Sequence, residues 1–213
     1  MMEEDDEEDY KEEAENKIEI KAILLGNAGV GKTNLINTCV GLNFESGNNP
    51  TTSGSFISKN IKLNDKNYLI NLWDTAGQER YKSITKIFLK KSEIVFFVYD
   101  ITDLKSFKDL KDWIEMCKEM IDNEFVGAIV GNKIDLYMNE QVNEEEAKTF
   151  AESNGFLFKL VSAKKEPRVF VNFLNELIDE REGIVKGNTK EQISIRKDVL
   201  ENKKPCNCWH IIF

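Results

Sequence analysis

The chain has 213 residues, of which 41% are hydrophobic, so it is long enough to bury one full core. Its net charge of −9 comes entirely from the first 16 residues, which hold ten acidic side chains and one lysine, because the remainder carries 28 acidic and 28 basic side chains. A neutral body has no general electrostatic attraction for nucleic acid, and no stretch approaches the roughly 18 apolar residues of a membrane-spanning helix.

Residues 1–16 are predicted to form an acidic disordered tail, because such a run of like charges repels itself and buries nothing. An acidic start also lacks the basic segment and apolar run of a secretory signal. Two interpretations of the tail stay open. It is either a solvated segment that favours solubility or a docking site for a basic partner.

From residue 17 to residue 182, short apolar runs alternate with amphipathic stretches, which is typical of a parallel sheet with crossover helices. The predicted strands are Ile18–Leu25, Phe56–Leu63, Tyr68–Trp73, Ile94–Tyr99, Ala128–Gly131 and Leu157–Val161. The predicted helices are Thr33–Val40, Lys82–Lys91, Leu104–Ile121, Asn143–Ser153 and Pro167–Glu182. A polar turn at residues 64–67 joins the second and third strands as a hairpin. We therefore expect an α/β domain with a mostly parallel six-stranded sheet, one antiparallel edge pair and helices on both faces.

A glycine-rich string stands directly after the first predicted strand and before the first predicted helix. It reads Gly26-Asn27-Ala28-Gly29-Val30-Gly31-Lys32-Thr33. Such a turn lets backbone N–H groups surround a phosphate group, and the following helix adds its positive N-terminal end. Lys32 supplies charge at the β- and γ-phosphates, and the Thr33 hydroxyl is a candidate Mg²⁺ ligand. The string predicts a nucleotide triphosphate site without saying which base is bound.

A second string, Asp74-Thr75-Ala76-Gly77-Gln78, follows the third predicted strand. A carboxylate at this strand end can hold Mg²⁺, usually through water, which makes Asp74 a candidate metal residue. The backbone N–H of Gly77 can reach the γ-phosphate. Gln78 then stands where it can orient a water molecule for in-line attack, so it is the candidate catalytic residue.

Two further strings follow the fifth and sixth predicted strands, at the sheet edge where open α/β folds bind ligands. In Asn132-Lys133-Ile134-Asp135, the Asp135 carboxylate can accept hydrogen bonds from N1–H and the N2 amine of guanine, a donor pair that adenine lacks. Asn132 can bind N7 and Lys133 can cover the ring. In Ser162-Ala163-Lys164, the Ala163 N–H can meet the guanine O6 oxygen. These residues favour a guanine nucleotide, GTP or GDP.

Together these motifs resemble the Ras superfamily of small GTPases over about residues 18–182, and the branch most similar to the chain is Rab. The Rab likeness rests on Trp73-Asp74-Thr75-Ala76-Gly77-Gln78-Glu79-Arg80-Tyr81-Lys82-Ser83-Ile84-Thr85 and on Val98-Tyr99-Asp100-Ile101-Thr102 followed by Ser106-Phe107, Leu110 and Trp113. The resemblance implies a P-loop NTPase G domain that binds Mg²⁺ and GTP. It also implies slow GTP hydrolysis without an activating protein, a monomeric state, and partners that include an exchange factor, an activating protein and effectors.

The resemblance adds residues that the motifs alone do not identify. Counting without gaps from Lys32 or from Trp73 makes Thr51 the switch residue that coordinates Mg²⁺ and the γ-phosphate, although matching on Thr-x-Gly selects Thr52. The same count places Phe44 where the family stacks an aromatic ring on guanine. The family pattern also implies an exposed apolar effector patch. Its residues are Phe56, Trp73 and Phe88, and for Phe88 a purely structural place in the core is the alternative.

Residues 183–213 lose the apolar period and are predicted to form a flexible hypervariable tail. Rabs usually carry prenylated cysteines near the carboxyl end, and Cys206 and Cys208 resemble such a pair, although five residues follow them. Lipidation there implies peripheral attachment to the cytosolic face of an intracellular membrane, beside a cytosolic pool. Zn²⁺ binding by Cys206, Cys208 and His210 is the alternative. Cys39 and Cys117 fall in apolar helix patterns and are expected to be buried thiols.

The leading hypothesis is a GTP-binding and GTP-hydrolysing switch that regulates vesicle-mediated transport. A Ras-like signalling protein or a nuclear-transport GTPase is the first alternative. A metabolic P-loop kinase is a remote one, because it requires an arginine-rich lid and the chain has only four arginines, none placed as a lid.

Overall fold

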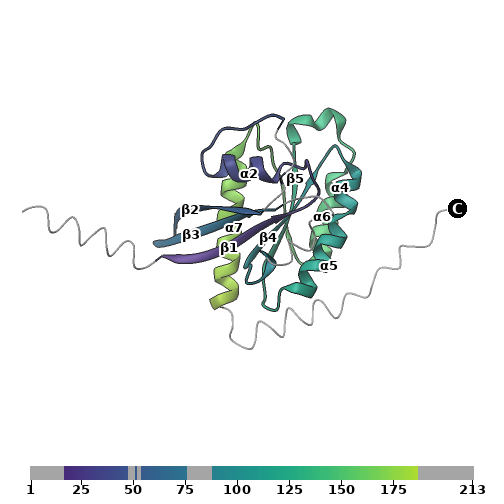
Figure 1. Cartoon of the computed structure of the whole chain (residues 1–213). Coiled ribbons are helices and arrows are strands. Elements are labelled where there is room, and N and C mark those ends of the chain that lie inside the picture. The colour runs from purple at the N-terminus through teal and green to yellow at the C-terminus, as the bar shows by residue number, and fades with distance from the viewer. Residues whose placement is uncertain (1–16, 48–50, 52–53, 76–87, 187–213) are drawn as a thin grey trace, which may run out of the picture.

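One six-stranded sheet organises the computed structural model, which describes residues 17–47, 51, 54–75 and 88–186 (Figure 1). The strands are β1 (Ile18–Leu25), β2 (Ser55–Leu63), β3 (Lys66–Asp74), β4 (Ile94–Asp100), β5 (Val126–Asn132) and β6 (Leu157–Leu160). They lie in the order β2-β3-β1-β4-β5-β6. Only β2 and β3 pair antiparallel, and the other four pairings are parallel. The predicted mixed sheet with one antiparallel edge pair is confirmed.

The hairpin between β2 and β3 turns on two residues, Asn64 and Asp65, which have positive φ values of 50° and 58°. Asn and Asp adopt this left-handed conformation more readily than other non-glycine residues, and such a turn has the twist that antiparallel strands need. Leu63 then pairs with Lys66 across the turn. The turn is therefore shorter than the predicted polar segment, because pairing begins two residues earlier.

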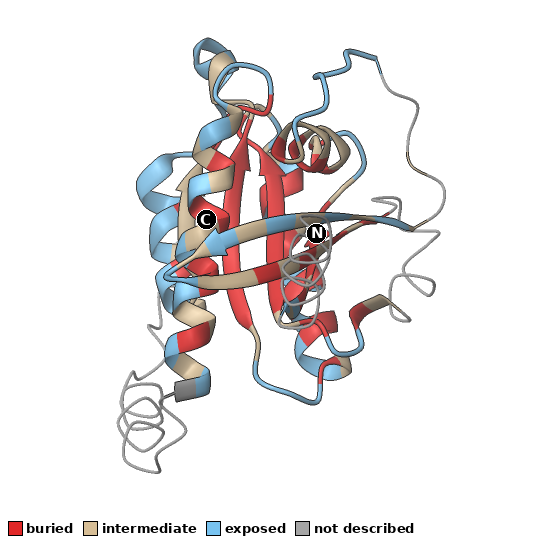
Figure 2. Ribbon diagram, turned by 90° about the vertical axis from the view of Figure 1, so that its left-hand side faces the viewer, coloured by how far each residue is buried: buried red, intermediate tan, exposed pale blue. Residues whose placement is uncertain are grey.

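Helices cover both faces of the sheet. On one face lie α2 (Lys32–Cys39) and α7 (Pro167–Lys186), which contact each other, and on the opposite face lie α4 (Leu104–Lys108), α5 (Leu110–Met120) and α6 (Glu144–Asn154) (Figure 1). Two hydrophobic clusters fill the two interfaces. The central strands β4 and β5 are buried along their whole length, as Figure 2 shows in red. Continuous burial explains why these strands read as unbroken apolar runs.

Most helix predictions agree with the structure. Asn143 caps α6 by accepting from the backbone N–H groups of Glu145 and Glu146, and Gly155 ends the helix with φ 72°. The predicted helix Leu104–Ile121 is divided at Asp109 into α4 and α5. The structure extends α7 to Lys186, four residues past the predicted end. Most of the predicted helix Lys82–Lys91 lies outside the described residues.

The two predicted buried thiols are confirmed. Cys39 on α2 and Cys117 on α5 are both buried and free. Burial disfavours the thiolate and raises the pKa of Cys39 to about 11 and that of Cys117 to about 12. No helix among the residues that the structure describes is long and apolar enough to cross a membrane.

The carboxyl edge of the parallel strands gathers the polar residues of the predicted motifs. Asp74 ends β3, Asp100 ends β4 and Asn132 ends β5, with Asp100 and Asn132 paired in register. The loop after β1 passes directly over β4, because a Cβ atom on Gly26 (φ 141°) would lie 2.0 Å from the carbonyl oxygen of Val98. Only glycine permits this approach. The fold thus places the loop after β1 beside the ends of three strands.

Candidate nucleotide-binding site

A cavity of about 390 Å³ opens at this edge, between the loops after β1, β5 and β6 and the segment after α2. Twelve of the predicted site residues line it: Ala28, Gly29, Gly31, Lys32, Thr33, Phe44, Thr51, Asn132, Lys133, Asp135, Ala163 and Lys164. Five others do not line it: Gly26, Asn27, Val30, Asp74 and Ser162. Two predicted site residues, Gly77 and Gln78, lie outside the described residues, as do Cys206 and Cys208 of the predicted lipidation site. Three of the four motifs therefore meet at one cavity, and Thr75 of the second motif lines it as well.

Lys32 is a buried cation that lines the cavity beside the loop after β1. Its Nζ donates to the carbonyl oxygens of Gly26 at 2.8 Å and Asn27 at 2.9 Å, and only 5% of the residue is exposed. Burial lowers its pKa to about 8, and the nearby Asp74 carboxylate partly opposes this shift. Both hydrogen-bond acceptors of the Lys32 ammonium group are neutral carbonyl oxygens. A bound anion would therefore stabilise the protonated form of Lys32, because negative charge favours it. This arrangement suits a phosphate group.

Three oxygen-bearing side chains meet beside Lys32. The Thr33 hydroxyl donates to Asp74 Oδ2 at 2.7 Å and lies 3.1 Å from the hydroxyl of Thr51, which is itself 3.5 Å from Asp74 Oδ2. Burial raises the pKa of Asp74, against the hydrogen bond from Thr33 and the charge of Lys32. Asp74 Oδ1 is buried and has no hydrogen-bond partner among the described residues.

This oxygen cluster fits a Mg²⁺ ion. The cluster contains only hard oxygen donors, which Mg²⁺ prefers, and it includes a carboxylate oxygen without a partner. Thr51 comes from the segment after α2, so its hydroxyl reaches the cluster from a different part of the chain than Thr33 and Asp74. The geometry thus agrees with the gap-free count that selected Thr51, while Thr52 lies outside the described residues.

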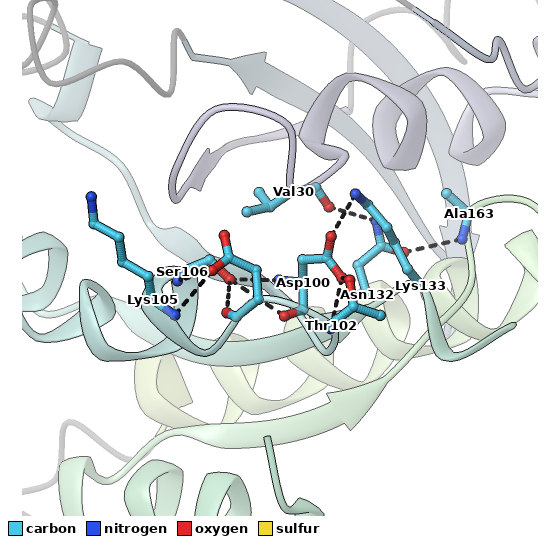
Figure 3. Close-up of polar contacts among 9 residues, drawn as sticks. Val30, Asp100, Thr102, Lys105, Ser106, Asn132, Lys133 and Ala163 are labelled. Carbon is cyan, nitrogen blue, oxygen red and sulfur yellow. Dashed lines mark hydrogen bonds and ion pairs between the residues drawn. The ribbon is translucent and has the colours of Figure 1, made fainter. Parts of the chain in front are cut away.

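Asn132 joins the phosphate end of the cavity to its far end. Its Nδ2 donates to the carbonyl oxygen of Val30 at 2.9 Å, and its Oδ1 accepts from the Ala163 N–H at 3.2 Å (Figure 3). A Cβ atom on Gly31 would lie 2.4 Å from Asn132 Nδ2, so the loop must carry glycine there. One buried amide therefore holds the loops after β1, β5 and β6 together.

Asp135 is oriented by Ser162. The Ser162 hydroxyl donates to Asp135 Oδ1 at 2.6 Å and accepts from the Lys165 N–H at 3.0 Å. Asp135 lines the cavity, and none of the described residues donates a hydrogen bond to its Oδ2. The weak Ser-Ala-Lys string thus supplies the residue that fixes the orientation of the predicted base-reading carboxylate.

Phe44 lines the cavity at the outer end with 37% of the residue exposed. Asn34 on α2 holds the segment that carries it, since its Nδ2 donates to the Glu45 carbonyl at 2.9 Å and its Oδ1 accepts from the Glu45 N–H at 3.0 Å. Sequence reasoning missed Asn34. No sequence signal was available, because its partner is the backbone of a segment without regular structure.

Asp100 is a second residue that sequence reasoning missed. Lys133 adopts φ 70°, and its Nζ forms a 2.6 Å ion pair with Asp100 Oδ2 (Figure 3). The other oxygen, Asp100 Oδ1, accepts from the Thr102 N–H at 2.9 Å and hydroxyl at 2.7 Å. The sequence did carry a signal for Asp100. This aspartate directly follows one predicted strand, and Asn132 follows the next predicted strand along the chain.

The three predicted effector residues form a continuous aromatic row. Phe56 and Trp73 stack with ring centroids 4.9 Å apart, and Trp73 and Phe88 lie 5.1 Å apart. Phe56 is 52% exposed, whereas Trp73 and Phe88 are half-buried and pack against the core on the α5 face. Phe88 therefore packs against the core, as the purely structural interpretation expects, and it also belongs to the aromatic row.

The fold and the cavity define a class, the P-loop proteins that bind guanine nucleotides. The Ras family model matches residues 21–180. Ras-related protein Rab-2B of Dictyostelium discoideum is 40% identical over 144 residues, covering 68% of this chain and 71% of the relative. RABA6b of Arabidopsis thaliana is 37% identical over 169 residues, covering 79% and 73%. Human Rab-21 is 36% identical over 180 residues, covering 81% and 79%.

The chain belongs to the Rab family of Ras-superfamily small GTPases. It binds GTP, hydrolyses it to GDP, and acts as a Rab-like regulator of vesicle traffic. The alternatives of a signalling or nuclear-transport GTPase and of a metabolic kinase are not favoured.

We predict that Asp100→Asn releases GDP about three- to tenfold faster, because the neutral amide holds the Lys133 ammonium less firmly. Asp103→Asn is the matched control. Asp103 caps α4 through the N–H groups of Lys105 and Ser106, and asparagine is also a good cap. Release of a fluorescent GDP analogue measures both rates. Equal rates for the two variants would show that the Asp100–Lys133 pair plays no part in holding the nucleotide.

Proposed function

We propose that the described site works as a switch in which GTP draws the Thr51 segment onto the phosphate loop. The observation that carries this proposal is the meeting of Thr51, Thr33 and Asp74 from three segments around one buried carboxylate. In the family's cycle, GTP orders two switch segments, effectors read that state, and hydrolysis releases it. In this proposal the Thr51 hydroxyl lies beside Thr33 and Asp74 when GTP is bound and leaves them after hydrolysis.

At the phosphate end, Thr33, Thr51 and Asp74 hold Mg²⁺, with Asp74 acting mainly through water. When bound, the ion neutralises charge on the β- and γ-phosphates. Lys32 keeps its hydrogen bonds to the carbonyl oxygens of Gly26 and Asn27 and directs its third N–H to a phosphate oxygen. The backbone N–H groups of the loop complete the anion site.

At the base end, Asp135 accepts from guanine N1–H and the N2 amine, and Phe44 and Lys133 cover the ring. Asn132 binds N7 through the second hydrogen of its Nδ2, and the Ala163 N–H is shared between Asn132 Oδ1 and guanine O6. Support comes from the hydrogen bond that Ser162 donates to Asp135 Oδ1, because Asp135 lines the cavity and no hydrogen bond to its Oδ2 is found among the described residues. This carboxylate discriminates guanine from adenine because adenine presents no matching donor pair.

We predict that isothermal titration finds tight binding of Mg²⁺–GDP and at least about 100-fold weaker binding of Mg²⁺–ADP. Asp135→Asn should weaken GDP binding by a similar factor, because it removes a charged double acceptor. Glu140→Gln is the control, since Glu140 is an exposed carboxylate just beyond the short helix at Ile134–Asn139. Comparable affinities of the wild type for GDP and ADP would contradict the proposed base-reading role of Asp135.

Hydrolysis is assigned to Gln78, which orients the attacking water, with Gly77 donating its N–H to the γ-phosphate. No arginine lines the cavity among the described residues, so turnover needs an arginine from an activating protein. The proposed partners also include an exchange factor and effectors. We propose that a monomer presents the Phe56–Trp73–Phe88 row to effectors, on the basis of its exposed Phe56 edge.

Gln78→Leu should keep GDP affinity unchanged and slow GTP hydrolysis by at least about tenfold, because leucine cannot orient water. Phosphate release under single-turnover conditions measures the effect. Gln141→Leu, at an exposed glutamine after β5, is the matched control and should hydrolyse GTP normally. A Gln78→Leu variant with wild-type turnover would rule out the catalytic assignment.

Three regions are proposed for the chain: an acidic tail at residues 1–16, a G domain at 17–182 and a hypervariable tail at 183–213, although α7 continues through residues 183–186. Lipidation of Cys206 and Cys208 gives the neutral body a membrane address that its own charge does not provide, with Lys203 and Lys204 adding weak attraction to anionic lipid. The protein then cycles between cytosol and the cytosolic face of an intracellular membrane.

Replacing both Cys206 and Cys208 with serine should move the protein from membrane to soluble fractions, because two lipid chains are lost. The control replaces the buried thiols Cys39 and Cys117 with serine, which should lower stability and leave partitioning unchanged. Mass spectrometry of the native carboxyl-terminal peptide decides between the outcomes. An unmodified mass for the peptide ending at Phe213 would exclude stable lipid anchoring at this end.

A further inference from the structure

We propose that Asn27, Asp109 and Trp113 form a clasp that positions the phosphate loop on α5, so that Asn27 is a positioning residue for β-phosphate binding. The proposal rests on the nucleotide site described above. It assigns to the Asn27 side chain a task away from the nucleotide, in agreement with the absence of Asn27 from the cavity lining.

The clasp consists of two hydrogen bonds from one amide. Asn27 Nδ2 donates to Asp109 Oδ2 at 2.7 Å, and Asn27 Oδ1 accepts from the Trp113 indole N–H at 3.2 Å. Trp113 is 1% exposed, so its indole N–H needs a partner inside the protein. These bonds span 82 and 86 residues of sequence, and they fasten the loop after β1 to the junction of α4 and α5.

The partners determine which end of the amide faces which neighbour. An indole N–H can only donate and an ionised carboxylate can only accept, so the Asn27 oxygen must face Trp113 and its nitrogen must face Asp109. A neutral amide satisfies both neighbours at once. An aspartate at position 27 could accept from Trp113, but it would meet Asp109 as a second carboxylate at hydrogen-bond distance.

The clasp acts on the phosphate end through the backbone of the same residue. The Asn27 carbonyl oxygen accepts from Lys32 Nζ at 2.9 Å, so residue 27 is bound to α5 by its side chain and to Lys32 by its main chain. The loop's other anchors are Gly26, which lies against β4, and its Val30–Gly31 end, where Asn132 binds the Val30 carbonyl and contacts Gly31. Ala28 and Gly29 between them are exposed, and a Cβ atom on Gly29 would meet nothing within 4 Å. The clasp is therefore the anchor of the exposed part of the loop.

An exchange of the two partners tests this proposal. Asn27→Asp places two carboxylates in contact and removes the donor, whereas the double variant Asn27→Asp/Asp109→Asn restores one donor and one acceptor with reversed polarity. Affinities for GDP and GMP are measured by competition with a fluorescent GDP analogue. GMP lacks the β-phosphate, so it reports on the base and α-phosphate contacts without the group that the clasp is proposed to serve.

We expect Asn27→Asp to weaken GDP binding at least tenfold and GMP binding less than threefold, and the double variant to return GDP affinity to within threefold of the wild type. Glu115→Gln is the control. It removes an exposed charge from α5, the helix that also carries Trp113, and it should change neither affinity. If Asn27→Asp does not fold, Trp113→Phe replaces it in the comparison, since it removes the indole donor and keeps an aromatic ring in the buried site.

Equal loss of GDP and GMP affinity, or no recovery in the double variant, would overturn the clasp and leave the nucleotide site intact. A different result would contradict the proposed nucleotide site, namely equal binding of GDP and ADP by the wild type. The two failures are therefore distinguishable in one set of titrations.

Discussion

The hydrogen bond from the Asn132 amide to the Val30 carbonyl is the contact on which the whole site depends, because it joins the phosphate loop to the loops at the base end. These loops leave three different strands, and the parallel sheet alone brings their ends only to the same edge. The amide also accepts from the Ala163 N–H, so a single buried side chain sets the spacing between the loop after β1 and the loop after β6. Gly31 makes this possible, since any Cβ atom there would displace the amide.

Burial at the phosphate end creates a charge arrangement that a nucleotide completes. Lys32 and Asp74 are both buried, and burial shifts both pKa values toward the neutral forms. Phosphate oxygens oppose the shift at Lys32, and a divalent cation opposes it at Asp74. Each group therefore becomes more fully charged when its ligand is present. The protein folds with a polar site whose electrostatics favour a metal-bound polyphosphate over water.

The sheet and the motif residues could be predicted from sequence because both depend on local patterns. Apolar runs identified all six strands, and β1 has the predicted bounds. Two of the residues that hold the motifs in place could not be predicted, because no sequence pattern links Asn34 to the backbone of Glu45 or Asp109 to Asn27. Asp100 differs from them, since its place at the end of a strand was a signal that sequence reasoning did not use. The division of one predicted helix into α4 and α5 falls at Asp109, the residue whose carboxylate accepts from Asn27.

Strand alternation places the oxygen cluster and the aromatic row on opposite faces of β3, at neighbouring residues. Trp73 and Asp74 are neighbours on β3, so their side chains point to opposite faces of the sheet. Asp74 faces the oxygen cluster, while Trp73 lies between Phe56 and Phe88 on the α5 face. Ser55 pairs with Asp74 and Phe56 pairs with Trp73, which ties β2 to the same two positions. Thr51 lies four residues before Ser55, so only a short length of chain separates the oxygen cluster from the strand that carries Phe56.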